Sequence, residues 1–161
     1  MIISLSMISE AVFILAIPFF LKKFGIKKVM LMSMFAWVLR FALFGIGDPG
    51  SGFIFLTFSM IIYGMAFDFF NISGSLFVEK EAKSSIRSSA QGLFMLMTNG
   101  LGAILGSIGS GYIVDAYTSD GTKDWTSIWF VFAIYAFVVA VLFALVFKYK
   151  HDQNEEMEIK H

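Results

Sequence analysis

Residues 126–147, TSIWFVFAIYAFVVAVLFALVF, run for 22 positions without a charged side chain. A helix needs roughly 20 mostly apolar residues to cross the hydrocarbon core of a bilayer. This stretch is therefore long enough and apolar enough to cross a membrane as one helix. Working outward from it, we find four more stretches of the same kind, at residues 2–21, 29–47, 53–78 and 88–115.

The composition of the whole chain agrees with a membrane protein. Of its 161 residues, 58% are hydrophobic and 15% are charged, whereas soluble domains average about 45–50% apolar and about 25% charged residues. The formal net charge is zero, which gives no electrostatic reason to expect nucleic acid as a partner. The chain has no cysteine, and we find no catalytic or phosphate-binding motif. We therefore expect no enzymatic activity, no cofactor and no metal site.

The expected fold is an all-α membrane protein with five transmembrane helices. Short loops separate the apolar stretches: Phe24-Gly25 breaks the first pair, and residues 48–52, DPGSG, give a strong turn signal between the second and third. We expect residues 1–150 to form a helical bundle in the lipid bilayer. Residues 151–161 are polar, charged and aperiodic, which predicts a tail outside the bilayer.

The distribution of basic residues predicts the orientation in the membrane. Ten of the twelve lysines and arginines fall on one side of the five stretches, one falls on the other side, and Arg40 lies within a stretch. Because loops rich in lysine and arginine stay in the cytoplasm, we expect an outer N-terminus and a cytoplasmic C-terminus. The ten residues are Lys22, Lys23, Lys27, Lys28, Lys80, Lys83, Arg87, Lys148, Lys150 and Lys160.

Three charged residues lie inside the apolar stretches, where a charge costs about 2.5–3.5 kcal/mol on insertion scales. Glu10 and Arg40 fall near the expected midplane, and Asp68 falls nearer the cytoplasmic side. For Arg40 we favour a structural charge, with Glu10 or Asp68 as a possible ion-pair partner. For Glu10 we favour a substrate or proton site, since midplane carboxylates mark such sites in transporters. Asp68 is a second candidate for proton coupling, with a structural role equally open.

The third stretch carries a polar and aromatic stripe. Tyr63, Phe67 and Asn71 are spaced i, i+4, i+8 and therefore share one helix face. Together with Glu10 at a similar depth, they suit a flat ligand that stacks on rings and forms hydrogen bonds through its hydroxyl groups. Ordinary helix packing is the alternative, and spacing alone favours it, because the chain has 20 phenylalanines.

The fourth stretch carries small residues at regular spacing. Gly102 and Gly106 form a GxxxG pair, and Ser107 and Gly111 form a small-xxx-small pair. Small residues at this spacing let helix backbones approach closely in a membrane. We interpret the four residues as a helix-packing surface, with sliding of the same surface during a conformational change as the alternative.

Two loops resemble those of the major facilitator superfamily. Residues 21–28, LKKFGIKK, resemble the degenerate second copy of the superfamily loop motif, and residues 86–92, IRSSAQG, resemble the loop before the eleventh helix. On this resemblance the five stretches correspond to helices eight to twelve of a major facilitator fold.

Three longer strings narrow the resemblance. Residues 9–20 (SEAVFILAIPFF), 36–41 (AWVLRF) and 63–79 (YGMAFDFFNISGSLFVE) resemble the bacterial nucleoside:proton symporter family. This resemblance implies proton-driven uptake of nucleosides across the bacterial inner membrane, with nucleoside contacts from Glu10, Tyr63 and Phe67. One position departs from the family, since Met7 stands where a glutamine is common.

The resemblance covers about residues 4–147 and does not include the seventh helix or the N-terminal half of the fold. Superfamily substrate sites lie between two halves, so we expect this chain to be the C-terminal part of a transporter, incompetent without the N-terminal half. Two alternatives stay open. One is a non-transporting membrane remnant or subunit, and the other is a major facilitator transporter for a sugar or another small metabolite.

Overall fold

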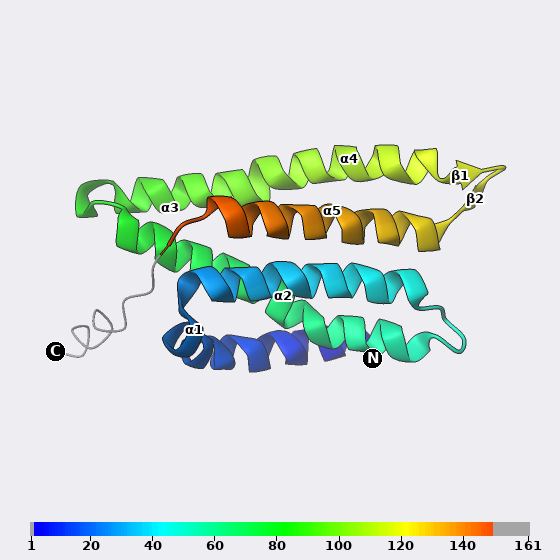
Figure 1. The fold of residues 1–161 in the computed structure, drawn as a ribbon, viewed down its shortest axis with the longest axis horizontal. Helices are drawn as coiled ribbons and strands as arrows, with labels where there is room; N and C mark the ends of the chain where they lie inside the picture. Colours follow the sequence, from blue (N-terminus) through cyan, green and yellow to red (C-terminus); the bar gives the residue numbers. More distant parts are fainter. Residues whose placement is uncertain (1, 150–161) are drawn as a thin grey trace.

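The computed structural model describes residues 2–149, with side chains from residue 6 onward. The tail expected at residues 151–161 lies outside the described residues. Four helical stretches are long and apolar enough to cross a membrane, namely Ser6–Ile46, Phe53–Glu81, Ser84–Ala116 and Trp125–Val146, and Figure 1 shows them along one long axis. In chain order the elements are α1 (Ile2–Ile46), α2 (Phe53–Glu81), η1 (Ser84–Ile86), α3 (Arg87–Met95), η2 (Leu96–Leu101), α4 (Gly102–Ala116), β1 (Thr118–Ser119), β2 (Thr122–Lys123) and α5 (Trp125–Val146).

Helix α1 reverses its direction at Gly25. It is 45 residues long, about twice the length that one membrane crossing needs. At Gly25 the backbone leaves the helical conformation, with φ 75° and ψ 166°, and the second half of α1 then runs back toward the opposite end of the molecule (Figure 1). Glycine adopts this conformation readily because it has no Cβ. The predicted break at Phe24-Gly25 is confirmed.

Two tight turns connect helices, and the sequence predicted the first of them. The Asp48 carboxylate accepts hydrogen bonds from the backbone N–H of Gly50 at 2.6 Å and of Gly52 at 3.0 Å, which closes the turn between α1 and α2. The β1–β2 hairpin joins α4 to α5, and its two turn residues, Asp120 and Gly121, have φ of 49° and 77°. Positive φ at both central residues is typical of a tight hairpin turn.

The core lies between α2 and the two halves of α1. Phe69 is fully buried, and its ring packs edge-on against Phe13 at 5.8 Å and at a tilt against Phe20 at 5.1 Å between centroids. Ile17 from the first half of α1 and Val29 from the second half complete this cluster. The reversal at Gly25 therefore brings both halves of α1 against the same face of α2.

Helix α5 packs on the second half of α1. The Trp129 ring lies 4.8 Å from Phe44 and 6.0 Å from Phe41, between centroids. At the other end of α5, Lys27 Nζ donates a hydrogen bond to the backbone carbonyl of Ala144 at 3.1 Å. These contacts hold α5 along the side of α1.

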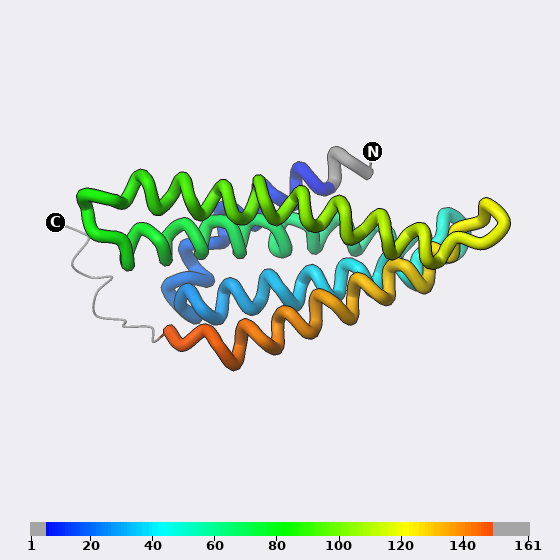
Figure 2. The backbone as a smooth tube through the Cα atoms, turned by 90° about the horizontal axis from the view of Figure 1, so that it is seen from above, coloured from blue at the N-terminus to red at the C-terminus, as the bar shows by residue number. Residues whose placement is uncertain are grey.

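Helices α3 and α4 continue one another, through η2, as one long rod (Figure 2). The α3 end is attached to α2: Ser75 Oγ donates to Gln91 Oε1 at 3.0 Å, and Gln91 Nε2 donates to the Ser75 carbonyl at 2.7 Å. Along α4, a Cβ added at Gly106 or Gly111 would meet nothing within 4 Å. Within the described residues the small-residue surface thus has no close neighbour at these two glycines, and its packing role stays a prediction.

Candidate functional site

The aromatic stripe of α2 forms a stacked pair. The Tyr63 and Phe67 rings lie 5.9 Å apart between centroids with 21° between their planes. Phe67 is 39% exposed, so part of its ring faces away from the bundle. One turn further on, Asn71 Nδ2 donates to the carbonyl of Phe67 at 3.0 Å. The stripe predicted from the spacing therefore exists as a continuous surface of two rings and an amide.

The α1 backbone at Glu10 lies against α2 at Gly64, the residue that follows Tyr63. A Cβ at Gly64 would lie 2.7 Å from the backbone nitrogen of Glu10 and 2.8 Å from its Cα. The α2 backbone at Gly64 therefore touches the α1 backbone at Glu10, which is the close approach that small residues permit in membrane helices. Since Tyr63 precedes Gly64 in the chain, the structure brings Glu10 and Tyr63 to the same level on neighbouring helices.

Two serine hydroxyls fix α2 against both halves of α1. Ser9 Oγ donates to the backbone carbonyl of Ile61, and Ser33 Oγ donates to that of Ala66 at 2.5 Å. The two acceptors flank Tyr63 and Gly64 in the chain. Both serines are buried, so these hydrogen bonds hold the Tyr63 segment from two sides in a water-poor environment.

Asp68 is buried next to this site. The residue is only 8% exposed, and its Oδ2 has no hydrogen-bond partner among the residues that the structure describes. It interacts electrostatically with Glu10, so the two acids lie within range of each other's charge. A buried acceptor without a partner requires a reason.

Arg40 lies among aromatic rings rather than in an ion pair. Its guanidinium carbon is 4.2 Å from the centroid of Tyr63, 5.1 Å from Trp37 and 5.3 Å from Phe44. For the side chains of residues 6–149, the one salt bridge found joins Arg87 to Glu79 at 3.9 Å. The pairing of Arg40 with Glu10 or Asp68, considered from the sequence, is thus not formed in the structure.

Sequence reasoning did not single out Trp37, Phe44 or Gly64 as parts of the site. Trp37 and Phe44 lie at i−3 and i+4 from Arg40, a spacing that puts all three on one helix face. That spacing is the signal from which an aromatic environment for the arginine follows. Gly64 stands inside a membrane-spanning pattern beside Tyr63, and an interior glycine of this kind indicates a close helix contact.

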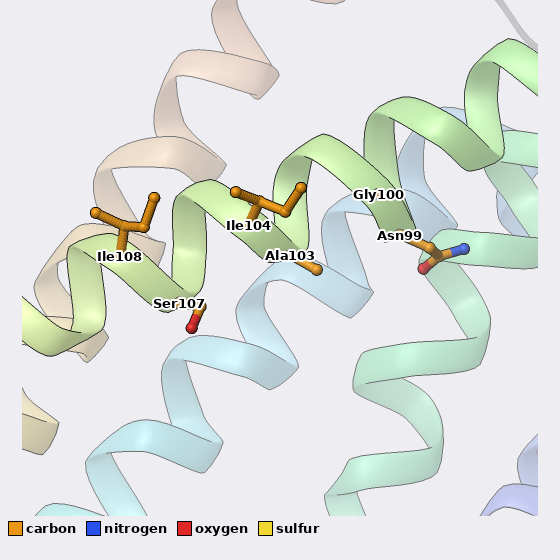
Figure 3. A pocket seen from close by; sticks show the side chains of 6 residues that line it. All are labelled: Asn99, Gly100, Ala103, Ile104, Ser107 and Ile108. Atoms are coloured by element: carbon orange, nitrogen blue, oxygen red, sulfur yellow. The ribbon is translucent and has the colours of Figure 1, made fainter.

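Two hollows lie along α4, and neither is lined by Glu10, Tyr63 or Phe67. One, of about 550 Å³, is drawn in Figure 3, where Ile104 and Ile108 project from one side of the helix and Ser107 from the other. A second, of about 780 Å³, lies between α4, α5 and Phe41 of α1.

In the part of the chain that the structure describes, no group of three or more histidine or acidic side chains is placed to hold a metal ion.

The side chains of Glu10, Tyr63 and Phe67 suit one kind of ligand. The Glu10 carboxylate can accept hydrogen bonds from hydroxyl or amide groups, and the stacked pair of Tyr63 and Phe67 offers a surface for a flat ring. The surface is open on the side where Phe67 is exposed. The chemistry of these side chains suits a planar, hydroxyl-bearing molecule.

Comparison with known proteins gives a family and a fold. The family model described as nucleoside H+ symporter matches residues 1–152. The xanthosine permease of Escherichia coli (strain K12) is 62% identical over an alignment of 161 positions, which covers 99% of this chain and 38% of the permease. The nucleoside permease NupG of the same organism is 59% identical over 151 residues, which are 93% of this chain and 36% of that protein.

Solved structures agree with this result. A crystal structure of the nucleoside transporter NupG superposes with a TM-score of 0.86 at 59% identity, covering 92% of this chain and 37% of the solved chain. A mutant of NupG gives a TM-score of 0.87 at 57% identity, over 91% of this chain. These relatives are named as permeases and transporters rather than as enzymes. The chain spans less than two fifths of the length of the curated relatives it matches.

Proposed function

Because this chain belongs to the nucleoside H+ symporter family, we propose that it is the C-terminal part of a transporter that uses a proton gradient to take up nucleosides. The family and the four apolar helical stretches indicate a multi-pass protein of the bacterial inner membrane. The names of the relatives, xanthosine permease and nucleoside permease, support a nucleoside as the substrate.

The contact between Gly64 and the Glu10 backbone is the observation that carries this proposal. It brings the segment of α1 that carries Glu10 against the segment of α2 that carries Tyr63, and the Tyr63 ring stacks with Phe67. A nucleoside has a flat base and a sugar with hydroxyl groups. In the proposed complex the base stacks on Phe67 and Tyr63, while Glu10 accepts hydrogen bonds from sugar hydroxyls or base N–H groups. Asn71 adds an amide at the end of the stripe.

Proton coupling is assigned to Glu10 and Asp68. The electrostatic interaction between the two acids supports this assignment, because a proton bound by either one removes a negative charge from beside the other. In the proposed cycle, proton binding at this pair and nucleoside binding at Glu10 therefore influence each other. Intramembrane acids with such roles are typical of transporters.

The membrane arrangement follows from α1. We propose that its two halves cross the bilayer separately on either side of Gly25, which gives five crossings in residues 1–150, equivalent to helices eight to twelve of a major facilitator fold. The tail at residues 151–161 is then cytoplasmic and the N-terminus lies outside. The ten basic residues on one side support this orientation.

The second wall of the site comes from the N-terminal half of the transporter. The chain spans only 38% of the xanthosine permease, and substrate sites of this superfamily lie between two halves. The test is to express this chain alone, and together with the N-terminal part of that permease, in cells without nucleoside transport. We expect uptake of radiolabelled xanthosine only with both parts, and loss of uptake with an uncoupler.

The outcomes separate the alternatives. Uptake by the chain alone contradicts the need for a second half. Copurification of both parts without uptake of any nucleoside favours a non-transporting subunit or remnant. Uptake of a labelled sugar but not of nucleosides favours a different substrate, an outcome for which Met7, in place of the glutamine common in the family, is the first residue to examine.

Removal of the exposed ring tests the stacking surface. Phe67→Ala is expected to raise the KM for nucleoside about tenfold, because an aromatic pair contributes about 0.5–1.5 kcal/mol beyond its buried area. Phe58→Ala is the matched control, since Phe58 lies on the same helix and is also exposed, at 51%. Equal KM values for the two variants would contradict stacking of the base on Phe67.

A further inference from the structure

We propose that Arg40 is a positioning residue, whose guanidinium holds the Tyr63 ring in the orientation in which it stacks with Phe67. The effect of Arg40 on nucleoside binding rests on the proposed function, whereas the contact between Arg40 and Tyr63 does not. Arg40 acts on the ligand through Tyr63, without touching it.

The contact geometry links two helices through one ring. Trp37 and Phe44 lie on the same helix as Arg40, but Tyr63 comes from α2, and it is the nearest of the three rings, at 4.2 Å from the guanidinium carbon. A cation within about 6 Å of a ring centroid is attracted by the negative face of the ring. The shortest such contact of Arg40 is therefore the one that reaches the candidate site.

The Nε atom of Arg40 makes no hydrogen bond in the described residues that would compete with its ring contacts. Arg40 Nε is buried and has no hydrogen-bond partner among the described residues. A buried N–H without an acceptor is rare and calls for an explanation. Contact with the faces of three rings supplies one, since the guanidinium is planar and less strongly hydrated than an ammonium group.

The Tyr63 ring is held by neighbours on both helices. The Trp37 ring meets it edge-on at 6.2 Å and 88°, and the Phe67 ring stacks on it at 5.9 Å. Without the guanidinium the ring keeps two aromatic neighbours but loses the attraction that joins its face to α1. It then samples more orientations before the ligand arrives, and binding has to restore the productive one.

The first experiment measures transport kinetics in the two-part transporter described above, with radiolabelled xanthosine. Arg40→Met is expected to raise KM about tenfold while the maximal rate per transporter in the membrane stays near that of the parent. Arg40→Lys retains the charge without the planar group, so KM should take an intermediate value. Lys123→Met is the matched control, because it removes a cation 5.4 Å from the Trp125 ring, far along the chain from the site.

A double-mutant cycle separates positioning from other roles. In a Tyr63→Leu background there is no ring to hold, so adding Arg40→Met should change KM less than twofold. If Arg40→Met raises KM by the same factor with and without the Tyr63 ring, Arg40 acts independently of Tyr63 and the proposal is wrong. An unchanged KM for both Arg40→Met and Arg40→Lys also overturns it.

The second experiment needs no transport. A fluorotyrosine placed only at position 63 of the purified 161-residue chain gives one fluorine resonance that reports the ring environment. Arg40→Met should shift and broaden this resonance, Arg40→Lys should shift it less, and Lys123→Met should leave it unchanged. A resonance insensitive to both Arg40 substitutions overturns the contact. If the resonance responds but Tyr63→Leu leaves uptake unaltered, the proposed nucleoside site fails instead.

Discussion

At the scale of single residues, Gly64 determines how closely α2 approaches α1. A Cβ at this position would lie 2.7 Å from the Glu10 nitrogen, and both groups belong to helix backbones that cannot move aside locally. Gly64→Ala should therefore push the helices apart and destabilise the protein by about 1–3 kcal/mol, the usual cost of overpacking. Thermal unfolding in detergent measures this effect.

The control for this substitution lies on α4. A Cβ at Gly106 meets nothing within 4 Å, so Gly106→Ala introduces the same methyl group without a clash inside this chain. We expect its unfolding temperature to stay at or above that of the parent, because alanine favours a helix over glycine by about 1 kcal/mol. Equal destabilisation by both substitutions would show that the close contact at Gly64 is absent.

Arg40 and Tyr63 illustrate which residue contacts were predictable. The spacing of Tyr63, Phe67 and Asn71 on one helix was enough to predict their shared face, because helix geometry fixes i, i+4 neighbours. The contact of Arg40 with Tyr63 joins two helices, so it depends on their crossing and on Gly64. No periodicity encodes that crossing, and an arginine in a membrane suggested an acidic partner instead.

At the scale of elements, the start of α5 is set by Asp124. Its carboxylate accepts hydrogen bonds from Ser127 Oγ at 2.6 Å and from the Ser127 backbone N–H at 3.1 Å. These bonds, the side-chain one first, hold the pKa of Asp124 below its ordinary value. The stabilisation by this cap is therefore complete above the ordinary pKa and is lost as the pH falls through the lowered one.

Ser127→Ala tests the cap directly. It removes the hydroxyl donor, so the pKa of Asp124 should rise toward the ordinary value for an aspartate. An NMR titration of the chain with labelled aspartate, compared with an Asp124→Asn variant to assign the resonance, measures this change. A pKa that stays the same after the substitution would mean that the hydroxyl does not stabilise the charged carboxylate.

The ends of elements were predictable where one residue type is required. Gly25 at φ 75° and the Asp48 turn follow from local chemistry that the sequence displays. The packing partner of α4 could not be predicted, because a GxxxG pattern indicates a surface for close helix packing but not which helix packs on it. In the described residues a Cβ at Gly106 or Gly111 would meet nothing within 4 Å, and Gly102 and Gly106 line the hollow between α4 and α5.

At the scale of the whole molecule, cysteine labelling can measure the orientation in the membrane. The chain has no native cysteine, so the reagent labels only the cysteine that is introduced. Gly50 lies in the turn between α1 and α2, and Lys83 lies between α2 and η1. We expect a cysteine at position 50 to react with an impermeant reagent in intact cells and one at position 83 to react only after permeabilisation. The reverse pattern would refute the orientation.

The central claim is that Glu10 and the Tyr63–Phe67 pair form one wall of a nucleoside site. Proton-driven xanthosine uptake by the two-part transporter with Glu10→Gln tests it most directly. Because a hydrogen bond to a charged group contributes about 1.5–3 kcal/mol, we expect uptake to fall about tenfold or more at unchanged membrane levels. Glu79→Gln, which alters the exposed partner of Arg87, should retain parental uptake. Parental uptake by Glu10→Gln would contradict the account.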